Sequence, residues 1–238
     1  MLHAIRFYYS FRNTIVILIG FISFCTHVAA QKEIRSYRAD RQIQYLTKEL
    51  SVPHDSVGYS IFLPTATPVG AVVFFGNTAY TKENYADESD MIIPALQKQL
   101  AVIFLSSGKI IDFYFHHTDL KRADSILNLA TTRHQIPKNR LLLCGLSLAG
   151  TRAMRYVMYC MDRRANSKIM PRAIAISDAP LDMIRFWGEE SFAMEVQHNQ
   201  MSAGEARFIL PLLEKNLGKP QNKQSYFSYS PFCYSAPK

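Results

Sequence analysis

Small residues surround one serine in the stretch RLLLCGLSLAG at residues 140–150. A serine that attacks a carbonyl carbon must stand clear of the backbone, within reach of a base and beside N–H donors for the negative charge that develops. A tight turn from a strand into a helix meets these needs, but only small residues fit two positions before and after the nucleophile. Here those positions hold Gly145 and Ala149. The spacing therefore predicts Ser147 as a nucleophile for acyl transfer.

The residues that follow Ser147 extend this interpretation. The backbone N–H of Leu148 would lie at the positive end of the next helix, so it is predicted to donate to the oxyanion. Gly150 and Ala153 would let that helix pack closely against the sheet. The alternative is an ordinary strand-to-helix turn in another α/β fold, in which the Ser147 hydroxyl caps the helix.

Short apolar runs alternate with stretches of helical spacing along most of the chain. Between the runs, apolar residues recur every three or four positions, as in amphipathic helices. Strands that alternate with helices form crossovers, so the sequence predicts an α/β fold in which a mostly parallel sheet carries helices on both faces. The predicted strands are 56–64, 69–76, 101–108, 140–144 and 173–177.

The segment 183–230 has a different character, with several aromatic residues and no buried strand. It is predicted to form a helical cap over the carboxyl ends of the strands, where open parallel sheets bind their ligands. Ser202 and Glu205 have the spacing of a capping box, which predicts that a helix begins at Ser202.

The chain resembles the α/β-hydrolase superfamily from about residue 56 to 182. The resemblance implies one domain over 31–238, with its core at about 56–182. It also implies an enzyme that hydrolyses an ester or amide of a small molecule or peptide through a serine, without a cofactor or metal ion. The stretches that carry it are VVFFGN (72–77), IPKNRLLLCGLSLAGTRAMRY (136–156) and PRAIAISDAPLD (171–182).

The resemblance also implies roles for individual residues. The nucleophile of the family maps onto Ser147. The residue after the glycine that ends the third strand supplies the second oxyanion N–H, and this position is Asn77. Two positions depart from the family pattern. Phe75-Gly76 replaces the usual His-Gly, which is tolerable because the backbone supplies the donor, and Ala149 replaces the second glycine of the motif.

The base and the acid of such a site are harder to assign. The family order is serine, then acid, then histidine. Only His198 follows Ser147, inside the predicted cap, while Asp178 and Asp182 follow the strand 173–177. No apolar strand follows the cap, so we expect a chain that lacks the last strands, the acid and the histidine. The alternative makes His198 the base, with Asp178 or Asp182 behind it.

The segment 1–30 is typical of a secretory signal peptide. It has a positively charged start, the uncharged apolar run TIVILIGFISF at 14–24, and the small residues Val28 and Ala30 at the positions that a signal peptidase reads. The sequence predicts cleavage before Gln31 and a secreted or periplasmic protein. The alternative is an uncleaved anchor, although the apolar run is shorter than the ~20 residues that span a bilayer.

Charge and ligand spacing limit the other possibilities. The net charge is +8 with no basic block longer than two residues, so no nucleic-acid partner is expected, and a membrane only if the N-terminal segment is uncleaved. His116 and His117 lie near Asp112 and Asp119, but adjacent histidines on a loop lack the spacing of metal ligands. Three hypotheses remain: an exported serine hydrolase, a truncated non-catalytic remnant or binding protein, and a membrane-tethered interaction protein.

Overall fold

The computed structural model describes residues 38–45, 56–75, 85–107, 112–196, 200–221 and 223–233. Its elements alternate between strands and helices up to residue 177 and are helical after it. They are β1 (Arg38–Tyr45), β2 (Ser56–Leu63), β3 (Gly70–Phe75), α2 (Tyr85–Gln97), β4 (Leu100–Ser107), α3 (His117–Arg133), β5 (Leu141–Leu146), α4 (Leu148–Met161), the 3-10 helix η2 (Arg163–Ala165), β6 (Ala173–Ser177), α5 (Met183–Val196), α6 (Gln200–Leu217) and α7 (Lys223–Tyr229).

The strands form one six-stranded sheet in the order β1-β2-β4-β3-β5-β6. Only β2 runs against the others, because its pairings with β1 and β4 are antiparallel and the remaining pairings are parallel. The predicted α/β class with a mostly parallel sheet is confirmed. Strand β1 was not predicted, because its sequence RADRQIQY has no apolar run; it pairs with β2 along its whole length, from Arg38 opposite Leu63 to Tyr45 opposite Ser56.

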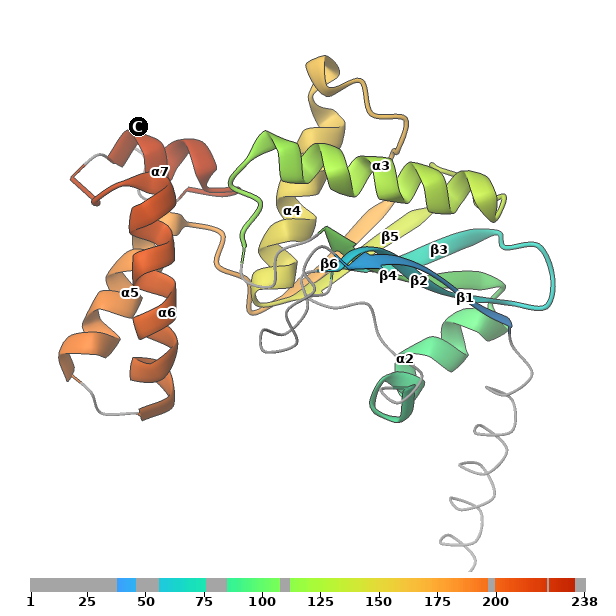
Figure 1. Cartoon of the computed structure of the whole chain (residues 1–238), viewed down its shortest axis with the longest axis horizontal. Helices are drawn as coiled ribbons and strands as arrows, with labels where there is room; N and C mark the ends of the chain where they lie inside the picture. Colours follow the sequence, from blue (N-terminus) through green and yellow to red (C-terminus); the bar gives the residue numbers. More distant parts are fainter. Residues whose placement is uncertain are drawn as a thin grey trace, which may run out of the picture.

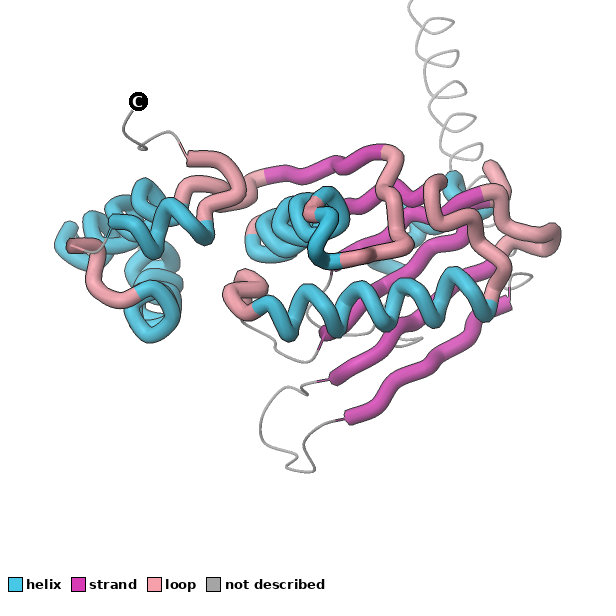
Figure 2. Tube along the Cα trace, turned by 90° about the horizontal axis from the view of Figure 1, so that it is seen from above, coloured by secondary structure: helices cyan, strands magenta, loops and turns pink. Residues whose placement is uncertain are grey.

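Helices cover both faces of this sheet, as predicted (Figures 1 and 2). Alternate residues of β4 are buried on opposite faces of the sheet, because successive side chains along a strand point to opposite sides. Ile103 is fully buried in the larger cluster, under α3 and α4, and Phe104 is buried in the smaller cluster, against Ile92 and Leu96 of α2. The sheet is thus fixed from both sides, and the carboxyl ends of its parallel strands are held in one row.

Strand β6 forms one edge of the described sheet and pairs only with β5. Its sequence AIAIS predicted a strand buried like the others, but Ala173 and Ala175 are exposed, and Ile174 and Ile176 are only half-buried. The reason is position: a strand at the edge has one neighbour, and α4 covers one of its faces. The apolar run identified the strand correctly, whereas its burial depended on its place in the sheet.

Helices α5, α6 and α7 form a lobe beside the carboxyl ends of the strands, at the left of Figure 1. Helix α6 begins at Gln200, before Ser202, so the predicted helix start is two residues late. The buried side chains of Phe113, Phe115 and Met183 join the lobe to the loop before α3. The division of the chain into a core and a cap at residue 182 stays a prediction.

Hydrogen bonds along one side of α4 fix the lobe in place. The Arg155 guanidinium donates to the carbonyl oxygens of Tyr114 (2.9 Å) and Tyr229, which are 115 residues apart in the chain. Burial lowers the pKa of Arg155 to about 10. The backbone N–H of Met183 donates to Ser230 Oγ at 2.9 Å, which connects the start of α5 to the residue after α7.

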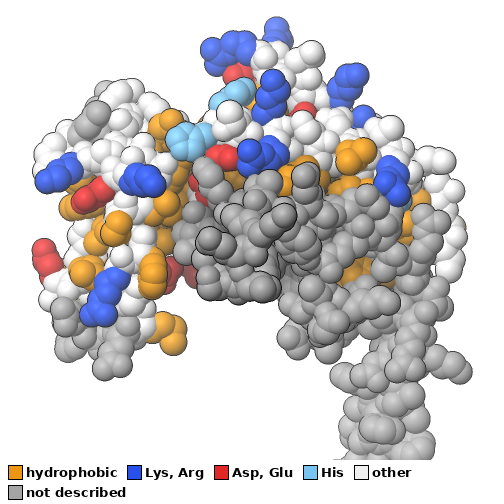
Figure 3. Space-filling view, in the orientation of Figure 1, with side chains coloured by type: hydrophobic (Ala, Val, Ile, Leu, Met, Phe, Trp, Pro, Cys, Tyr) orange, Lys and Arg blue, Asp and Glu red, His pale blue; other side chains and the backbone are white. Residues whose placement is uncertain are grey.

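The surface of the lobe exposes several large apolar side chains, among them Phe192, Met201 and Phe208. On the face drawn in Figure 3, Lys and Arg side chains are spread over several elements rather than gathered into one patch. No helix in the described part of the chain is both long and apolar enough to cross a bilayer.

Candidate functional site

Ser147 occupies a strained turn between β5 and α4. Its backbone has φ 52° and ψ −126°, a conformation that residues other than glycine rarely adopt and that costs on the order of 1–3 kcal/mol. The Ser147 carbonyl oxygen accepts from the N–H groups of Gly150 (2.9 Å) and Thr151 (3.2 Å), which begins the helix immediately after the turn. This is the geometry of the sharp strand-to-helix turn that presents a nucleophile.

Close packing explains the small residues around the turn. A Cβ added at Gly145 would lie 2.4 Å from both the backbone carbon and the oxygen of Ala149. A Cβ added at Gly150 would lie 2.7 Å from the Cβ of Ala179. No side chain larger than hydrogen fits at either position unless the backbone or its neighbour moves. The motif glycines are therefore required by the turn itself.

The Ser147 side chain is not used as a helix cap. It makes no capping hydrogen bond, and a capping residue would have extended backbone rather than a positive φ. The Ser147 N–H instead donates to the carbonyl oxygen of Ser177 at 2.9 Å, which ties the end of β5 to the end of β6. The alternative of an ordinary capped turn does not describe this geometry.

Leu148 is the first residue of α4, so its N–H is one of the four donors that a helix leaves unpaired at its start. No hydrogen bond between described residues uses this N–H. It lies beside the Ser147 hydroxyl at the positive end of the helix, where a developing oxyanion would be stabilised. The second predicted donor, Asn77, lies outside the described residues, and so does His198.

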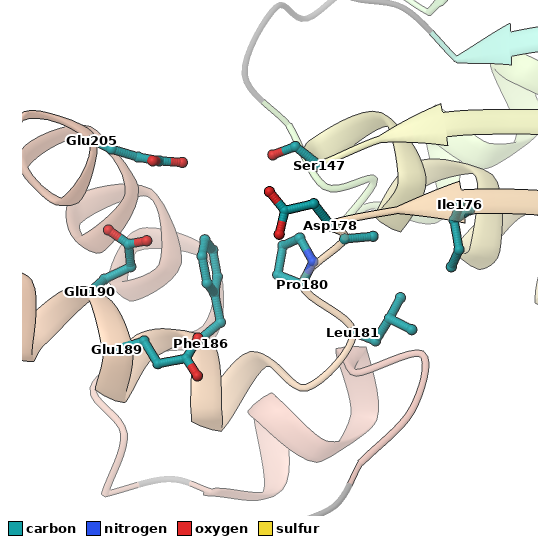
Figure 4. Close-up of a pocket in the computed structure, with 10 residues that line it drawn as sticks. Ser147, Ile176, Asp178, Pro180, Leu181, Phe186, Glu189, Glu190 and Glu205 are labelled. Carbon is teal, nitrogen blue, oxygen red and sulfur yellow. The ribbon is translucent and has the colours of Figure 1, made fainter. Parts of the chain in front are cut away.

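The two candidate acids have different environments. Cα pairing between the strands places Leu146 opposite Ser177, so the next position in register sets Ser147 level with Asp178. Asp178, with φ 49°, lines the same pocket as Ser147 (Figure 4). Asp182 is buried and its Oδ1 accepts from the N–H groups that begin α5, at 3.1 and 3.2 Å. The structure brings Asp178 to the serine and uses Asp182 as a helix cap.

A pocket of about 520 Å³ opens beside Ser147, between the ends of β5 and β6 and the helices α5 and α6. The wall at the strand ends carries Ser147 and Asp178 together with apolar residues, and the lobe wall opposite carries three carboxylates and the ring of Phe186 (Figure 4). Its volume suits a small molecule or the end of a peptide. The lining residues are Ser147, Ile176, Asp178, Ala179, Pro180, Leu181, Phe186, Glu189, Glu190 and Glu205.

Hydrogen bonds from α4 hold the walls of this pocket. The Thr151 hydroxyl donates to the carbonyl oxygen of Pro180 at 2.7 Å, which positions the loop after β6. Arg152 is almost fully buried; its Nε donates to the Asp112 carbonyl oxygen and its guanidinium carbon lies 5.4 Å from the centroid of the Tyr114 ring. These contacts fix the helix that follows Ser147 and the loop that leads out of β6.

The histidines of the described region lie away from the pocket. His116 and His117 are exposed at the start of α3, where the His117 ring packs on Tyr159 with centroids 5.3 Å apart. His134 Nε2 lies 3.2 Å from the hydroxyl oxygen of Tyr59. Among described residues, no three His, Cys, Asp or Glu side chains are grouped so that they could hold a metal ion, at His116 and His117 or elsewhere.

Sequence reasoning missed the carboxylates of the lobe. Glu189, Glu190 and Glu205 follow no motif, and Glu205 was interpreted only as part of a capping box. Their approach to Ser147 depends on how α5 and α6 pack beside the sheet, which local spacing does not encode. The one available signal was the adjacent acidic pair Glu189-Glu190 in a helix that is mostly apolar.

No known protein family and no curated protein matches the sequence. Solved structures do match. The acylaminoacyl peptidase of Pyrococcus horikoshii has a TM-score of 0.53 at 10% identity, over 84% of this chain and 30% of the peptidase. Esterase B from Lactobacillus rhamnosis has a TM-score of 0.45 at 14% identity, over 90% and 71%. Lipase A of Candida antarctica has a TM-score of 0.43 at 11% identity, over 67% and 41%.

The chain thus spans less than half the length of the peptidase and of the lipase, so the activities of those whole proteins come to this chain only as proposals. The likeness to the peptidase bears on the fold. Together with the strand order, the single antiparallel strand β2 and the turn at Ser147, it establishes that this chain has the α/β-hydrolase fold.

Proposed function

We propose that the protein is a serine hydrolase that cleaves an ester or amide through Ser147. The observation that carries this proposal is the strained turn at Ser147, whose hydroxyl makes no capping bond and lines a pocket. Strain of this kind persists only where the surrounding structure enforces it, and it is concentrated at functional sites. The matching structures named as a peptidase, an esterase and a lipase support the same class of reaction.

The chemistry is acyl transfer in two steps. Ser147 Oγ attacks the carbonyl carbon while a base takes the hydroxyl proton; the carbon–leaving-group bond then breaks, and the departing oxygen or nitrogen receives that proton. Water attacks the acyl-serine in the same way and releases the acid and the free hydroxyl. The N–H groups of Leu148 and Asn77 hold the negative oxygen in both steps.

The alternative base is His198, with Asp178 or Asp182 as the acid behind it, and of these two acids Asp178 lines the pocket with Ser147. His198→Ala should abolish turnover, and Asp178→Asn should lower it. Asp182→Asn should weaken α5 without this loss of turnover, because Asp182 caps that helix. If His198→Ala retains full activity, the base is another group.

The proposal is tested with a fluorophosphonate probe, which forms an Oγ–P bond with an activated serine and expels fluoride. The full chain should be labelled at Ser147, and Ser147→Ala should abolish labelling and cut turnover of a p-nitrophenyl ester by about 10⁶. Ser125→Ala, on the exposed side of α3, is the matched control and should change neither. Labelling that persists in Ser147→Ala would contradict the proposal.

The oxyanion donor at Asn77 has its own test. Asn77→Ala keeps the backbone N–H and should change turnover little, whereas Asn77→Pro removes it and should lower turnover by roughly 10²–10³. Equal turnover in the two variants would rule out a backbone donor at this position.

The rival proposal is a non-catalytic binding protein. It is favoured by one observation, namely that none of the described residues that line the pocket is a histidine. A chain that binds small molecules in the pocket but resists the fluorophosphonate probe would support this rival.

We also propose that the protein is exported after cleavage before Gln31. The support is the three-part pattern of residues 1–30. N-terminal sequencing of the mature protein should begin at Gln31; a mature protein that begins at Met1 would support the membrane-tethered alternative.

A further inference from the structure

Two carboxylates of the lobe face Ser147 across the pocket. Glu205 of α6 points toward Ser147 and Asp178, and Glu190 of α5 lies beneath it with its carboxylate turned to the same space (Figure 4). In Figure 3, acidic side chains are visible at the junction between the lobe and the rest of the molecule. The wall opposite the predicted nucleophile is therefore negative.

Glu190 is the unusual member of this wall, because it is buried without a partner. Only 9% of its surface is exposed, and its Oε2 atom has no hydrogen-bond donor among the described residues. Burial raises the pKa of Glu190 to about 7, with further contributions from the nearby charges of Glu205 and Glu189. A buried carboxylate without a hydrogen-bond donor is costly unless a ligand supplies the donor and a positive charge.

No side chain in the described part of the chain donates a hydrogen bond to Glu190 Oε2. Arg185 of the same helix directs its Nε to Glu189 Oε1, at 2.8 Å on the exposed side of α5. Asp178, the group that faces Glu190 from the end of β6, is acidic as well. The described residues offer no group of three ligands for a metal ion, so an organic cation fits this wall better.

We propose that Glu190 and Glu205 bind an ammonium or guanidinium group of the substrate, so that the chain prefers acyl substrates with a cationic side chain. This inference rests on the proposed function, since it names the substrate class of the same site. A cation here would give Glu190 Oε2 the donor it lacks and form charge-assisted hydrogen bonds with both carboxylates. The ring of Phe186, which lies beside Glu190 on α5, and the apolar lining residue Leu181 on the opposite side would contact the aliphatic stem of that side chain (Figure 4).

The test separates binding from catalysis. Equilibrium binding is measured on the full chain carrying Ser147→Ala, with Nα-acetyl-lysinamide and its neutral analogue Nα-acetyl-norleucinamide, which lacks the ammonium group. The lysine probe should bind at least tenfold more tightly. Glu190→Gln and Glu205→Gln should each remove about tenfold of that preference, since each deletes one charge-assisted contact.

Matched controls exist on the same helices. Glu195 of α5 and Glu214 of α6 are exposed and do not line the pocket, so Glu195→Gln and Glu214→Gln make the same charge change elsewhere. Neither control should alter the preference. If Glu190→Gln disturbs the fold, as monitored by circular dichroism, the exposed Glu205 still provides the test.

Equal binding of the two probes, no binding of the lysine probe, or an equal loss in pocket and control variants would overturn the inference. These outcomes are independent of hydrolysis. If Nα-acetyl-lysine methyl ester is not cleaved by the unsubstituted chain while the binding pattern holds, the proposed function fails and the cation site stands. If the ester and its norleucine analogue are cleaved at equal kcat/KM, the function stands and the cation site fails.

Discussion

The two sides of the pocket are built on different principles. On the side of β5 and α4, space is filled: a Cβ at Gly145 or Gly150 would meet another atom at 2.4 or 2.7 Å. At the two glycines of α5 and α6 space is open instead, because a Cβ at Gly188 or Gly204 would meet nothing within 4 Å. Steric exclusion fixes the turn that carries Ser147, whereas charge distinguishes the lobe that faces it.

This contrast fits the two proposed roles, in which the side of β5 and α4 holds the nucleophile and the lobe selects the substrate by its charge. A nucleophile must be held within a fraction of an ångström, and only close-packed backbone does so. A wall that recognises charge acts over longer distances and tolerates a looser framework. Substitution of each of these four glycines by alanine therefore gives a matched series of variants, because each variant adds the same methyl group in a different environment.

The largest effect is expected at Gly145→Ala. The added Cβ meets backbone atoms of Ala149, which cannot rotate away, so the turn must open. We expect the free energy of unfolding to fall by about 3 kcal/mol and fluorophosphonate labelling of Ser147 to disappear. Urea denaturation and gel-based labelling measure the two effects. Labelling at the unsubstituted rate would show that the turn is not needed.

A smaller effect is expected at Gly150→Ala, because the nearest atom is the side-chain Cβ of Ala179. We expect a loss of about 1–3 kcal/mol in the free energy of unfolding. Adding Ala179→Gly removes the opposing methyl group and should restore part of that loss. A double-mutant cycle measures the coupling. Strict additivity of the two changes would mean that the two positions are not in contact.

In the lobe, substitution of glycine by alanine should stabilise the protein instead of destabilising it. Gly188 and Gly204 lie inside α5 and α6, where alanine has the higher helix propensity and the space is free. Each substitution to alanine should raise the free energy of unfolding by about 0.5–1 kcal/mol, with labelling unchanged. Thermal denaturation provides the measurement. Destabilisation at these positions would remove the contrast between the two sides of the pocket.

The smallest effect concerns pH. The pKa of Glu190 is raised from 4.5 to about 7, so the folded state binds more protons than the unfolded state between these values. Stability from this group is present below pH 4.5 and is lost as the pH rises through 7. Glu190→Gln should therefore gain stability relative to the unsubstituted chain from pH 4.5 to 7. Solvent in the pocket screens part of this effect.

Melting temperatures across this pH range test the expectation. Glu195→Gln is the control, because this residue is exposed on the same helix. A difference between the Glu190→Gln variant and the unsubstituted chain that stays constant with pH would mean that Glu190 titrates normally.

Much of the fold was predictable because its signals are local. The apolar runs of β3, β4 and β5 identify three strands of the sheet, of which β4 is buried on both faces and alternate residues of β5 are half-buried. The residues around Ser147 identify a sharp turn, since both patterns follow from packing against near neighbours. Strand β1 was not predictable. Its sequence is polar, and it is a strand because β2 offers it a backbone edge to pair with.

The sequence by itself determined which serine stands at a strained turn, because the clash at Gly145 arises within six residues of chain. Only the tertiary structure decided what surrounds that serine. Strand register set Asp178 level with Ser147, while helix capping used Asp182. The packing of the lobe brought Glu190 and Glu205 to the same pocket. These three acidic residues lie 31 to 58 positions after Ser147 in the chain, and no local sequence pattern records such separations.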